Sequence, residues 1–252
     1  MPGKDMNHAI ESTTNLRPKR RFLSRAWTFL KYAFAALLVA IIVAHFVYKY
    51  TGTGKWELFQ QKDGVTVYKK KDPGSTVVQY KGIMKVESSL TSFTRFMQDP
   101  TTCDDVGCTD TVVIKEESPQ VQYMSFVYDY HPFDKRQFVV KVDVSQDPKT
   151  KSVTIKYLGH PDLVPEDACC VRVPRMNNIW IAHPIARNQI EVEYIVDMYE
   201  GGMLPYPLTN YFHSRTPFKA FAKISEFVKG EKYRKKYIDD GKTLPFVIEP
   251  QY

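Results

Sequence analysis

Two different patterns of apolar residues divide the chain. From Trp27 to Tyr48 the sequence is almost continuously apolar, and only Lys31 in these 22 residues carries a full charge. A helix of about 20 such residues crosses the hydrocarbon core of a bilayer. Beyond residue 55, apolar and polar residues alternate, which is typical of antiparallel strands with one buried and one wet face. The pattern predicts one transmembrane helix followed by a sheet-rich domain.

The charge around the apolar segment predicts its orientation. Residues 1–49 carry a net charge of +6, of the +7 on the whole chain, and six basic residues precede Ala26. Lys and Arg are enriched on the cytoplasmic side of membrane helices, so we expect a cytoplasmic amino terminus and an exported domain. The nearly neutral remainder offers no basic excess for binding nucleic acid.

Two alternatives compete with an uncleaved anchor. A cleaved signal peptide would also have a basic segment followed by an apolar one, but no small-x-small cleavage site follows the apolar run. A buried core helix seldom needs such an unbroken apolar run behind a block of basic charge. We therefore interpret the segment as a single-pass signal anchor.

The alternating patterns predict the secondary structure of the domain. A hairpin is expected around Lys62-Asp63-Gly64, and further strands are expected over residues 138–144, 153–157 and 190–198. Helical spacing predicts a short helix over 90–97, capped by Ser88 or Ser89, and a long helix over 207–229 that Pro217 should kink or split. Strands with segregated helices indicate an α+β fold.

The same patterns divide the chain into five segments. We expect a disordered basic tail (1–25), a transmembrane anchor (26–50), a linker (51–55), a globular domain (56–230) and a carboxy-terminal extension (231–252). In the domain, a curved antiparallel sheet wrapped around one long final helix would leave an internal space for a ligand.

Several motifs in order resemble the StAR-related lipid transfer (START) domain. The resemblance rests on Trp56-Glu57-Leu58 with Lys62-Asp63-Gly64, then Asp134-Lys135-Arg136-Gln137-Phe138-Val139, then Val171-Arg172-Val173-Pro174-Arg175-Met176, Trp180, Ile190-Glu191-Val192-Glu193-Tyr194 and Gly201-Gly202-Met203-Leu204-Pro205. It covers roughly residues 54–230. It implies a helix-grip fold that binds one lipid without enzymatic conversion, and its similarity to bacterial members suggests an inner-membrane protein with a periplasmic domain.

The chain departs from the family in two places. Cholesterol-carrying members have a buried ion pair in the cavity, but the matching positions here are Val142 and, approximately, Tyr123. A sterol would therefore not be held by that pair. The family's Trp after the first helix is also replaced, around Cys103 to Cys108.

The resemblance and strand parity together predict the ligand site. The family's gate loop falls on residues 159–168, where Leu163 and Val164 would either touch a bilayer or pack inward as ordinary loop residues. Arg136 and Arg175 lie in apolar surroundings, and each would contact a lipid head group or form an ion pair with an acid such as Glu193. The predicted ligand-binding residues are Phe138, Val140, Val142, Tyr157, Arg175, Val192, Tyr194, Phe212 and Phe221.

The sequence shows little sign of catalytic chemistry. Four cysteines allow three pairings, and a loop disulfide between Cys103 and Cys108 suits an oxidising compartment. No His lies at ligand spacing from either cysteine pair, so we expect no metal site, and no cofactor motif occurs.

Three functions remain open at this stage. The first is binding or transfer of a phospholipid, fatty acid or sterol-like lipid at the membrane that holds the anchor. The second is a helix-grip enzyme, a cyclase or hydrolase-like protein, that would need an acid/base pair such as Asp129 with His131. The third is a sensor or scaffold whose ligand alters partner binding.

Overall fold

The computed structural model describes residues 18–252, with side chains from residue 25 onward, and divides into two compact units, Met1–Tyr48 and Lys49–Tyr252. The first contains most of helix α1 (Pro18–Tyr50), whose stretch Arg25–Tyr50 is long and apolar enough to span a membrane. The predicted tail ended at residue 25, whereas the helix already begins at Pro18, because proline fits the first helical turn and the following Lys and Arg are good helix formers. Residues 1–17 of that tail lie outside the described residues.

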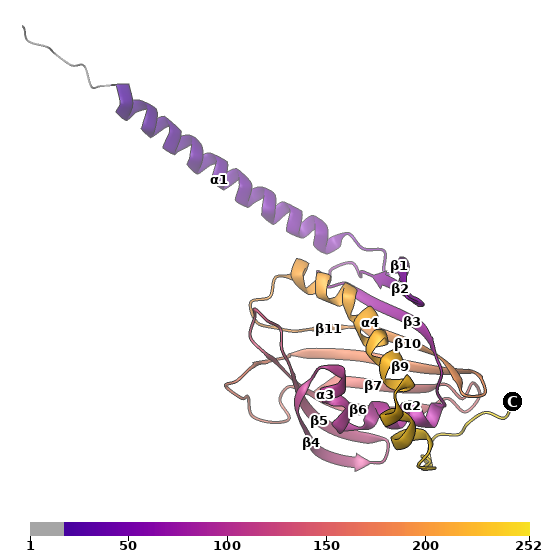
Figure 1. The fold of residues 1–252 in the computed structure, drawn as a ribbon. Helices are drawn as coiled ribbons and strands as arrows, with labels where there is room; N and C mark the ends of the chain where they lie inside the picture. The colour runs from indigo at the N-terminus through magenta and orange to yellow at the C-terminus, as the bar shows by residue number, and fades with distance from the viewer. Residues whose placement is uncertain (1–17) are drawn as a thin grey trace, which may run out of the picture. The chain divides into compact units, whose positions relative to one another are not determined.

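The second unit is built on one large sheet, shown in Figure 1. Its strands run in the spatial order β1-β2-β3-β10-β9-β7-β6-β5-β4, with β11 against β9 and β8 against β6. Among the strands of the described residues, only the β6–β8 pair is parallel. The strands are β1 (Glu57–Lys62), β2 (Val65–Lys70), β3 (Gln79–Val86), β4 (Thr109–Ser118), β5 (Val121–Tyr128), β6 (Arg136–Gln146), β7 (Val153–Gly159), β8 (Val171–Arg172), β9 (Arg175–Ala186), β10 (Gln189–Val196) and β11 (Met198–Tyr199).

Local sequence accounts for several of these elements. The predicted hairpin is confirmed: β1 and β2 join through Asp63 and Gly64, which both have the positive φ angles that a two-residue hairpin turn requires. The short helix is also confirmed as α2 (Leu90–Gln98), and the Ser89 side chain accepts a hydrogen bond from the Ser92 amide as its amino-terminal cap. Strands β4, β5 and β9 were not predicted, and their polar residues and, in β9, Pro184 obscure the alternation.

The long final helix α4 (Tyr206–Lys229) crosses one face of the sheet (Figure 1). It continues through Pro217 and is not split there. Gly82 on β3 makes this packing possible, since a Cβ atom at Gly82 would lie only 2.7 Å from Pro217 and 2.8 Å from Phe221. A bare backbone at this point lets the helix approach the strand closely.

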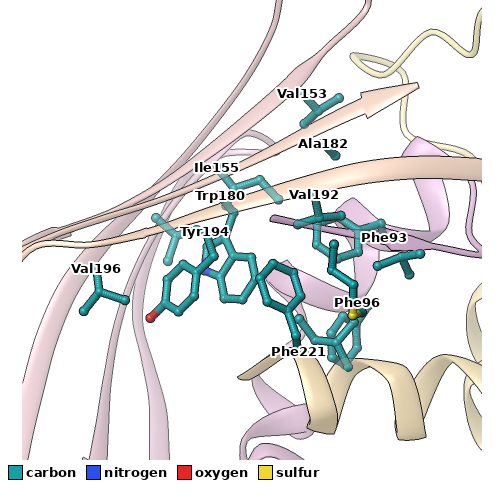
Figure 2. Packing of buried hydrophobic residues seen from close by; sticks show 14 of the residues in the cluster. Phe93, Phe96, Val153, Ile155, Trp180, Ala182, Val192, Tyr194, Val196 and Phe221 are labelled. Carbon is teal, nitrogen blue, oxygen red and sulfur yellow. The ribbon is translucent and has the colours of Figure 1, made fainter. Parts of the chain in front are cut away.

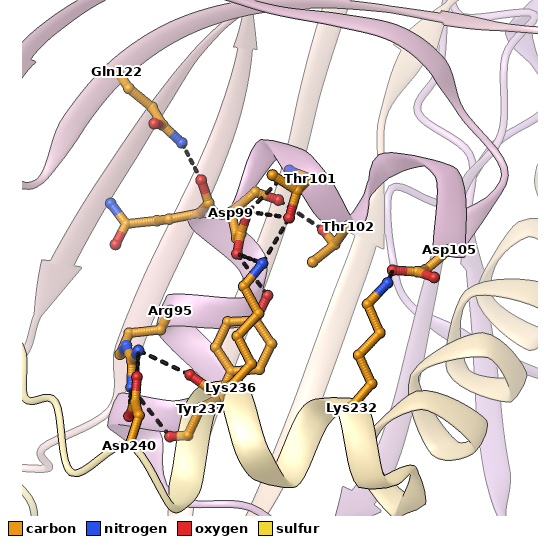
Figure 3. A network of polar contacts seen from close by, with 11 residues as sticks. Arg95, Asp99, Thr101, Thr102, Asp105, Gln122, Lys232, Lys236, Tyr237 and Asp240 are labelled. Carbon is orange, nitrogen blue, oxygen red and sulfur yellow. Dashed lines mark hydrogen bonds and ion pairs between the residues drawn. The ribbon is translucent and has the colours of Figure 1, made fainter.

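The carboxy-terminal segment belongs to the same unit, although the sequence suggested a separate extension from residue 231. It forms α5 (Glu231–Tyr233) and η2 (Arg234–Ile238) and buries Tyr233 and Tyr237 in the core. Figure 3 shows how polar contacts fix it to α2, the turn η1 (Pro100–Thr102) and α3 (Cys103–Val106): Arg95 pairs with Asp240, and Asp99 with Lys236. The final residues thus close one side of the core.

The predicted linker is likewise tied to the domain. The Gly54 amide donates to the Lys71 carbonyl at 3.1 Å, and the Lys71 ammonium donates to the Thr51 carbonyl at 2.8 Å. These contacts hold residues 51–55 against the end of β2, so the compact unit begins before the predicted boundary.

Candidate ligand-binding cavity

A cavity of about 760 Å³ lies between the sheet and helix α4. This volume is within the range of small-molecule sites in proteins. Its wall is mostly aromatic and aliphatic, and its residues come from α2, the η1–α3 turn, seven strands and α4. The aromatic, methionine and amide side chains in the wall are Phe96, Met97, Met124, Phe126, Tyr128, Tyr130, Phe138, Tyr157, Met176, Asn178, Trp180, Tyr194, Met198 and Phe212.

The cavity occupies one end of the sheet. The lining residues come from the carboxy-terminal halves of β5, β7 and β10 and from the amino-terminal halves of β6 and β9. Because these strands are antiparallel, those halves lie at the same end. At the other end the same face is filled: Val153, Ile155 and Val192 are buried there and pack with Phe93 in the cluster of Figure 2. The sheet therefore covers a solid end and a hollow end.

The structure brings four of the predicted binding residues into the wall, namely Phe138, Tyr157, Tyr194 and Phe212. Four others, Val140, Val142, Val192 and Phe221, are buried in the core but do not line the cavity. Strand parity placed these side chains on the inner face, but it carries no information about position along the strand.

The alternation of apolar and polar residues does not identify some of the residues that line the cavity. Asn178 and Trp180 lie on β9, which was not predicted as a strand, and Tyr130 lies in the loop after β5. Alternation does occur in β9, where Asn178, Trp180 and Ala182 are buried in turn. An inward-facing asparagine hides that signal, because asparagine is mostly an exposed residue.

All charged side chains that line the cavity, except that of Asp99, lie at its edge. Asp129, His131, Lys219, Lys223 and Glu226 line it and are exposed, on α4 and on the loop between β5 and β6. This is where the cavity meets solvent.

Asp99 is the one charged lining residue in the described chain that is not exposed. Burial opposes its ionisation, but hydrogen bonds from Lys236, Tyr237 and Thr101 outweigh burial and lower the pKa of Asp99 to about 2. The ionised Asp99 carboxylate therefore binds the carboxy-terminal segment. The rest of the inner wall is uncharged.

Arg136 and Arg175 do not contact the cavity. Arg175 is partly exposed and pairs with Asp197 at 2.7 Å. Arg136 is buried, donates to the carbonyls of Asp134 and Gly201, and lies over the Tyr130 ring. Arg175 thus forms the ion pair expected as the alternative to a head-group contact, but with Asp197. Glu193, the acid given as an example of a partner, pairs with Lys81 and His183 across neighbouring strands.

A buried acid–histidine pair lies close to Tyr130 and was not anticipated. Glu200 Oε1 and His213 Nε2 are 2.6 Å apart, and both side chains are almost completely buried. The pair ties α4 to the segment after β11, and breaking such a pair costs about 3–5 kcal/mol because the remaining charge is left uncompensated. This indicates a structural role for His213.

The predicted gate loop is held by an arginine. Arg172 donates to the carbonyls of Pro161, Val164 and Pro165, and to the side chain of Gln137. Leu163 is 43% exposed, and neither it nor Val164 lines the cavity. The loop therefore presents an apolar side chain to solvent from a fixed base.

All four cysteines form disulfides. Cys103 bonds to Cys108, as expected, and both line the cavity beside α3. The adjacent Cys169 and Cys170 bond to each other just before β8. Among the described residues no group of three or more His, Cys, Asp or Glu side chains is placed to hold a metal ion.

The pair suggested for acid–base chemistry lies at the cavity edge. Asp129 accepts a hydrogen bond from the backbone amide of His131 at 2.9 Å. In the described part of the chain, this backbone contact is the hydrogen bond that joins the two residues, and none joins the Asp129 carboxylate to the His131 imidazole.

Known proteins resemble this chain in sequence and in structure to different degrees. No model of a protein family matches the chain. An uncharacterized protein of Pseudomonas aeruginosa is 26% identical over 160 residues, which are 62% of this chain and 78% of that protein.

Solved structures agree more closely in shape than in sequence. The STAR-related lipid transfer protein of Xanthomonas axonopodis has a TM-score of 0.65 and 20% identity, covering 71% of this chain and 100% of the other. Human StAR-related lipid transfer protein 5 has a TM-score of 0.60 and 16% identity, covering 78% of this chain and 97% of the other. The sheet, the final helix and the cavity between them thus form the helix-grip fold of the StAR-related lipid transfer domains.

Proposed function

We propose that this protein binds one lipid in the cavity under α4 and carries it at the surface of the membrane that holds α1. The observation that carries the proposal is the mostly apolar cavity of about 760 Å³, whose inner wall is uncharged apart from Asp99. Burying an alkyl chain there is favourable by about 0.8 kcal/mol per CH₂ group. The fold shared with lipid transfer proteins supports the same function.

The anchor would make the domain effective at low abundance. A tethered domain meets its membrane at a high effective concentration, so moderate affinity suffices for exchange. Exposed Leu163 at the tip of the β7–β8 loop offers an apolar contact for the bilayer, and we propose that this loop is the gate. The basic charge before Ala26 favours a cytoplasmic amino terminus and a periplasmic domain.

Extraction of the full-length protein from a bacterial membrane tests the binding function. We expect mass spectrometry to find about one intact lipid per chain. Ala220→Phe should abolish it, because Ala220 lines the cavity and a phenyl ring would fill it. Lys229→Phe, on the same helix but outside the cavity, is the matched control. Equal lipid content in both variants would contradict the proposal.

We further propose that the bound lipid is not chemically converted. Incubation with the extracted lipid should return it unchanged, and His131→Ala should leave that result as it is. Turnover that His131→Ala abolishes would instead support an enzyme. Fusion of a compartment-sensitive reporter to the carboxy terminus tests the orientation, and a reporter active in the cytoplasm would contradict it.

A further inference from the structure

Three tyrosine hydroxyls gather in the hollow end of the domain. Tyr128 ends β5, Tyr130 follows in the next loop, and Tyr194 lies on β10; all three line the cavity. Burial and then the tyrosines of the same wall, Tyr128, Tyr130 and Tyr157, raise the pKa of Tyr194. They bring polar atoms into a wall that is mostly apolar.

The hydroxyl of Tyr194 is fixed by a hydrogen bond that it accepts, and its own proton remains available to donate. Asn178 Oδ1 accepts from the Asp197 amide at 3.0 Å, which directs Asn178 Nδ2 to donate to the Tyr194 hydroxyl at 3.2 Å. The Tyr194 ring stacks on Trp180 with 3.7 Å between centroids. A hydroxyl that already accepts a hydrogen bond has one proton to donate.

A fourth tyrosine in the same wall provides the contrast. Tyr157 donates to the Met97 carbonyl at 2.5 Å, so its proton is already used. Within residues 18–252, no protein group accepts a hydrogen bond from Tyr128, Tyr130 or Tyr194. Polar groups inside a protein are generally paired, so these unused donors, together with the unpartnered Thr111 hydroxyl in the same wall, point to a ligand that accepts from them.

The surroundings select an uncharged acceptor. Burial raises the pKa of Tyr128, Tyr130 and Tyr194, so at neutral pH all three hydroxyls keep their protons. No described cation lines the inner wall: Lys219 and Lys223 lie at the exposed edge, and Arg136 lies over the Tyr130 ring but outside the lining. The Arg136 guanidinium already donates to the carbonyls of Asp134 and Gly201. An ionised head group beside the tyrosines would therefore lose its hydration without direct contact with a cation.

We propose that Tyr128, Tyr130 and Tyr194 form a recognition site for an uncharged oxygen acceptor on the ligand: a carbonyl, ester or hydroxyl oxygen. This rests on the proposed lipid-binding function and names the class of lipid. The protein would select a neutral oxygen-bearing lipid over a plain hydrocarbon or an ionised fatty acid.

Three probes of similar chain length test this selectivity: 2-tridecanone, tridecane and laurate. Each is radiolabelled and equilibrated at pH 8 with the full-length protein in nanodiscs, and retention by empty nanodiscs is subtracted. We expect 2-tridecanone to bind about tenfold more tightly than tridecane, as a net gain of one hydrogen bond implies. Laurate should bind more weakly than the ketone.

Tyrosine-to-phenylalanine variants test whether the tyrosine hydroxyls cause the preference for the ketone. Tyr194→Phe should reduce the ketone preference toward one and leave tridecane binding unchanged. The control Tyr199→Phe removes the hydroxyl of an exposed tyrosine outside the cavity, so it should keep the preference. The proposal is overturned if ketone and alkane bind equally, if Tyr194→Phe keeps the preference, or if laurate binds best. Should no probe be retained above empty nanodiscs, the lipid-binding function itself fails as well.

Discussion

The two ends of the sheet differ although the same strands build both. At the solid end Val192 and Ile155 are completely buried and pack against the α2 side of the core. Two residues further along, on the same face, Tyr194 and Tyr157 line the cavity. The alternation of each strand is identical at both ends. The contrast shows that the cavity exists because of what lies opposite the strands, and not because of the strands' own residues.

Replacing an aromatic ring by alanine should have different effects at the two ends of the sheet. At the solid end it should mainly lower the free energy of unfolding, which is the largest effect we expect, and at the hollow end it should mainly weaken lipid binding. Phe93→Ala should lower the free energy of unfolding by about 3–5 kcal/mol, because it leaves a void in a filled core. Phe212→Ala, at the half-buried cavity wall, should cost clearly less but weaken lipid binding. Urea unfolding and lipid retention measure the two effects. A larger loss of stability for Phe212→Ala would contradict the division.

A methyl group at Gly82 should disturb the seating of α4. Gly82→Ala places Cβ against Pro217 and Phe221, both of which are buried. Overpacking of this kind costs about 1–3 kcal/mol. Adding Phe221→Leu to Gly82→Ala relieves one of the two contacts, so the double variant should lose less than the sum of the single losses. Strict additivity in urea unfolding would contradict a direct clash.

Loss of the Arg172 hydrogen bonds should increase the mobility of the β7–β8 loop without affecting the rest of the sheet. Arg172→Ala removes the side chain that donates to three loop carbonyls, and we expect a loss of about 1–2 kcal/mol. Hydrogen exchange should rise in residues 161–165 and stay unchanged in the solid end. Arg187→Ala, on the exposed β9–β10 turn, is the control. A rise throughout the sheet would show that the arginine supports the whole domain.

The contact between Asp99 and the carboxy-terminal segment should give the smallest, pH-dependent effect. Its pKa is lowered from 3.8 to about 2 in the folded protein, so the ionised form stabilises the fold above pH 4. That contribution disappears as the pH falls from about 4 to 2. The difference in stability between wild type and Asp99→Asn should shrink over the same interval. If the difference in stability between wild type and Asp99→Asn stayed constant between pH 7 and 2, the stabilising role of the ionised Asp99 carboxylate would be contradicted.

The sequence by itself determined every feature that depends on local pattern. The apolar run fixed the membrane-length helix, Asp63-Gly64 fixed the hairpin turn, and Ser89 fixed the start of α2. Alternation correctly placed Phe138, Val142, Tyr157 and Val192 on the inner face. Each of these signals lies within a few residues of what it determines.

Only the tertiary structure decided which inner-face residues meet a ligand. Phe138 and Tyr157 line the cavity while Val142 and Val192 pack in the core, because α2 and the carboxy-terminal segment fill one end, whereas no side chain of the described residues fills the other. The free proton of Tyr194 depends on Asn178, sixteen residues earlier, and on an amide of Asp197. Strand period is a local property, whereas empty space and unused donors arise from segments that meet only after the chain has folded.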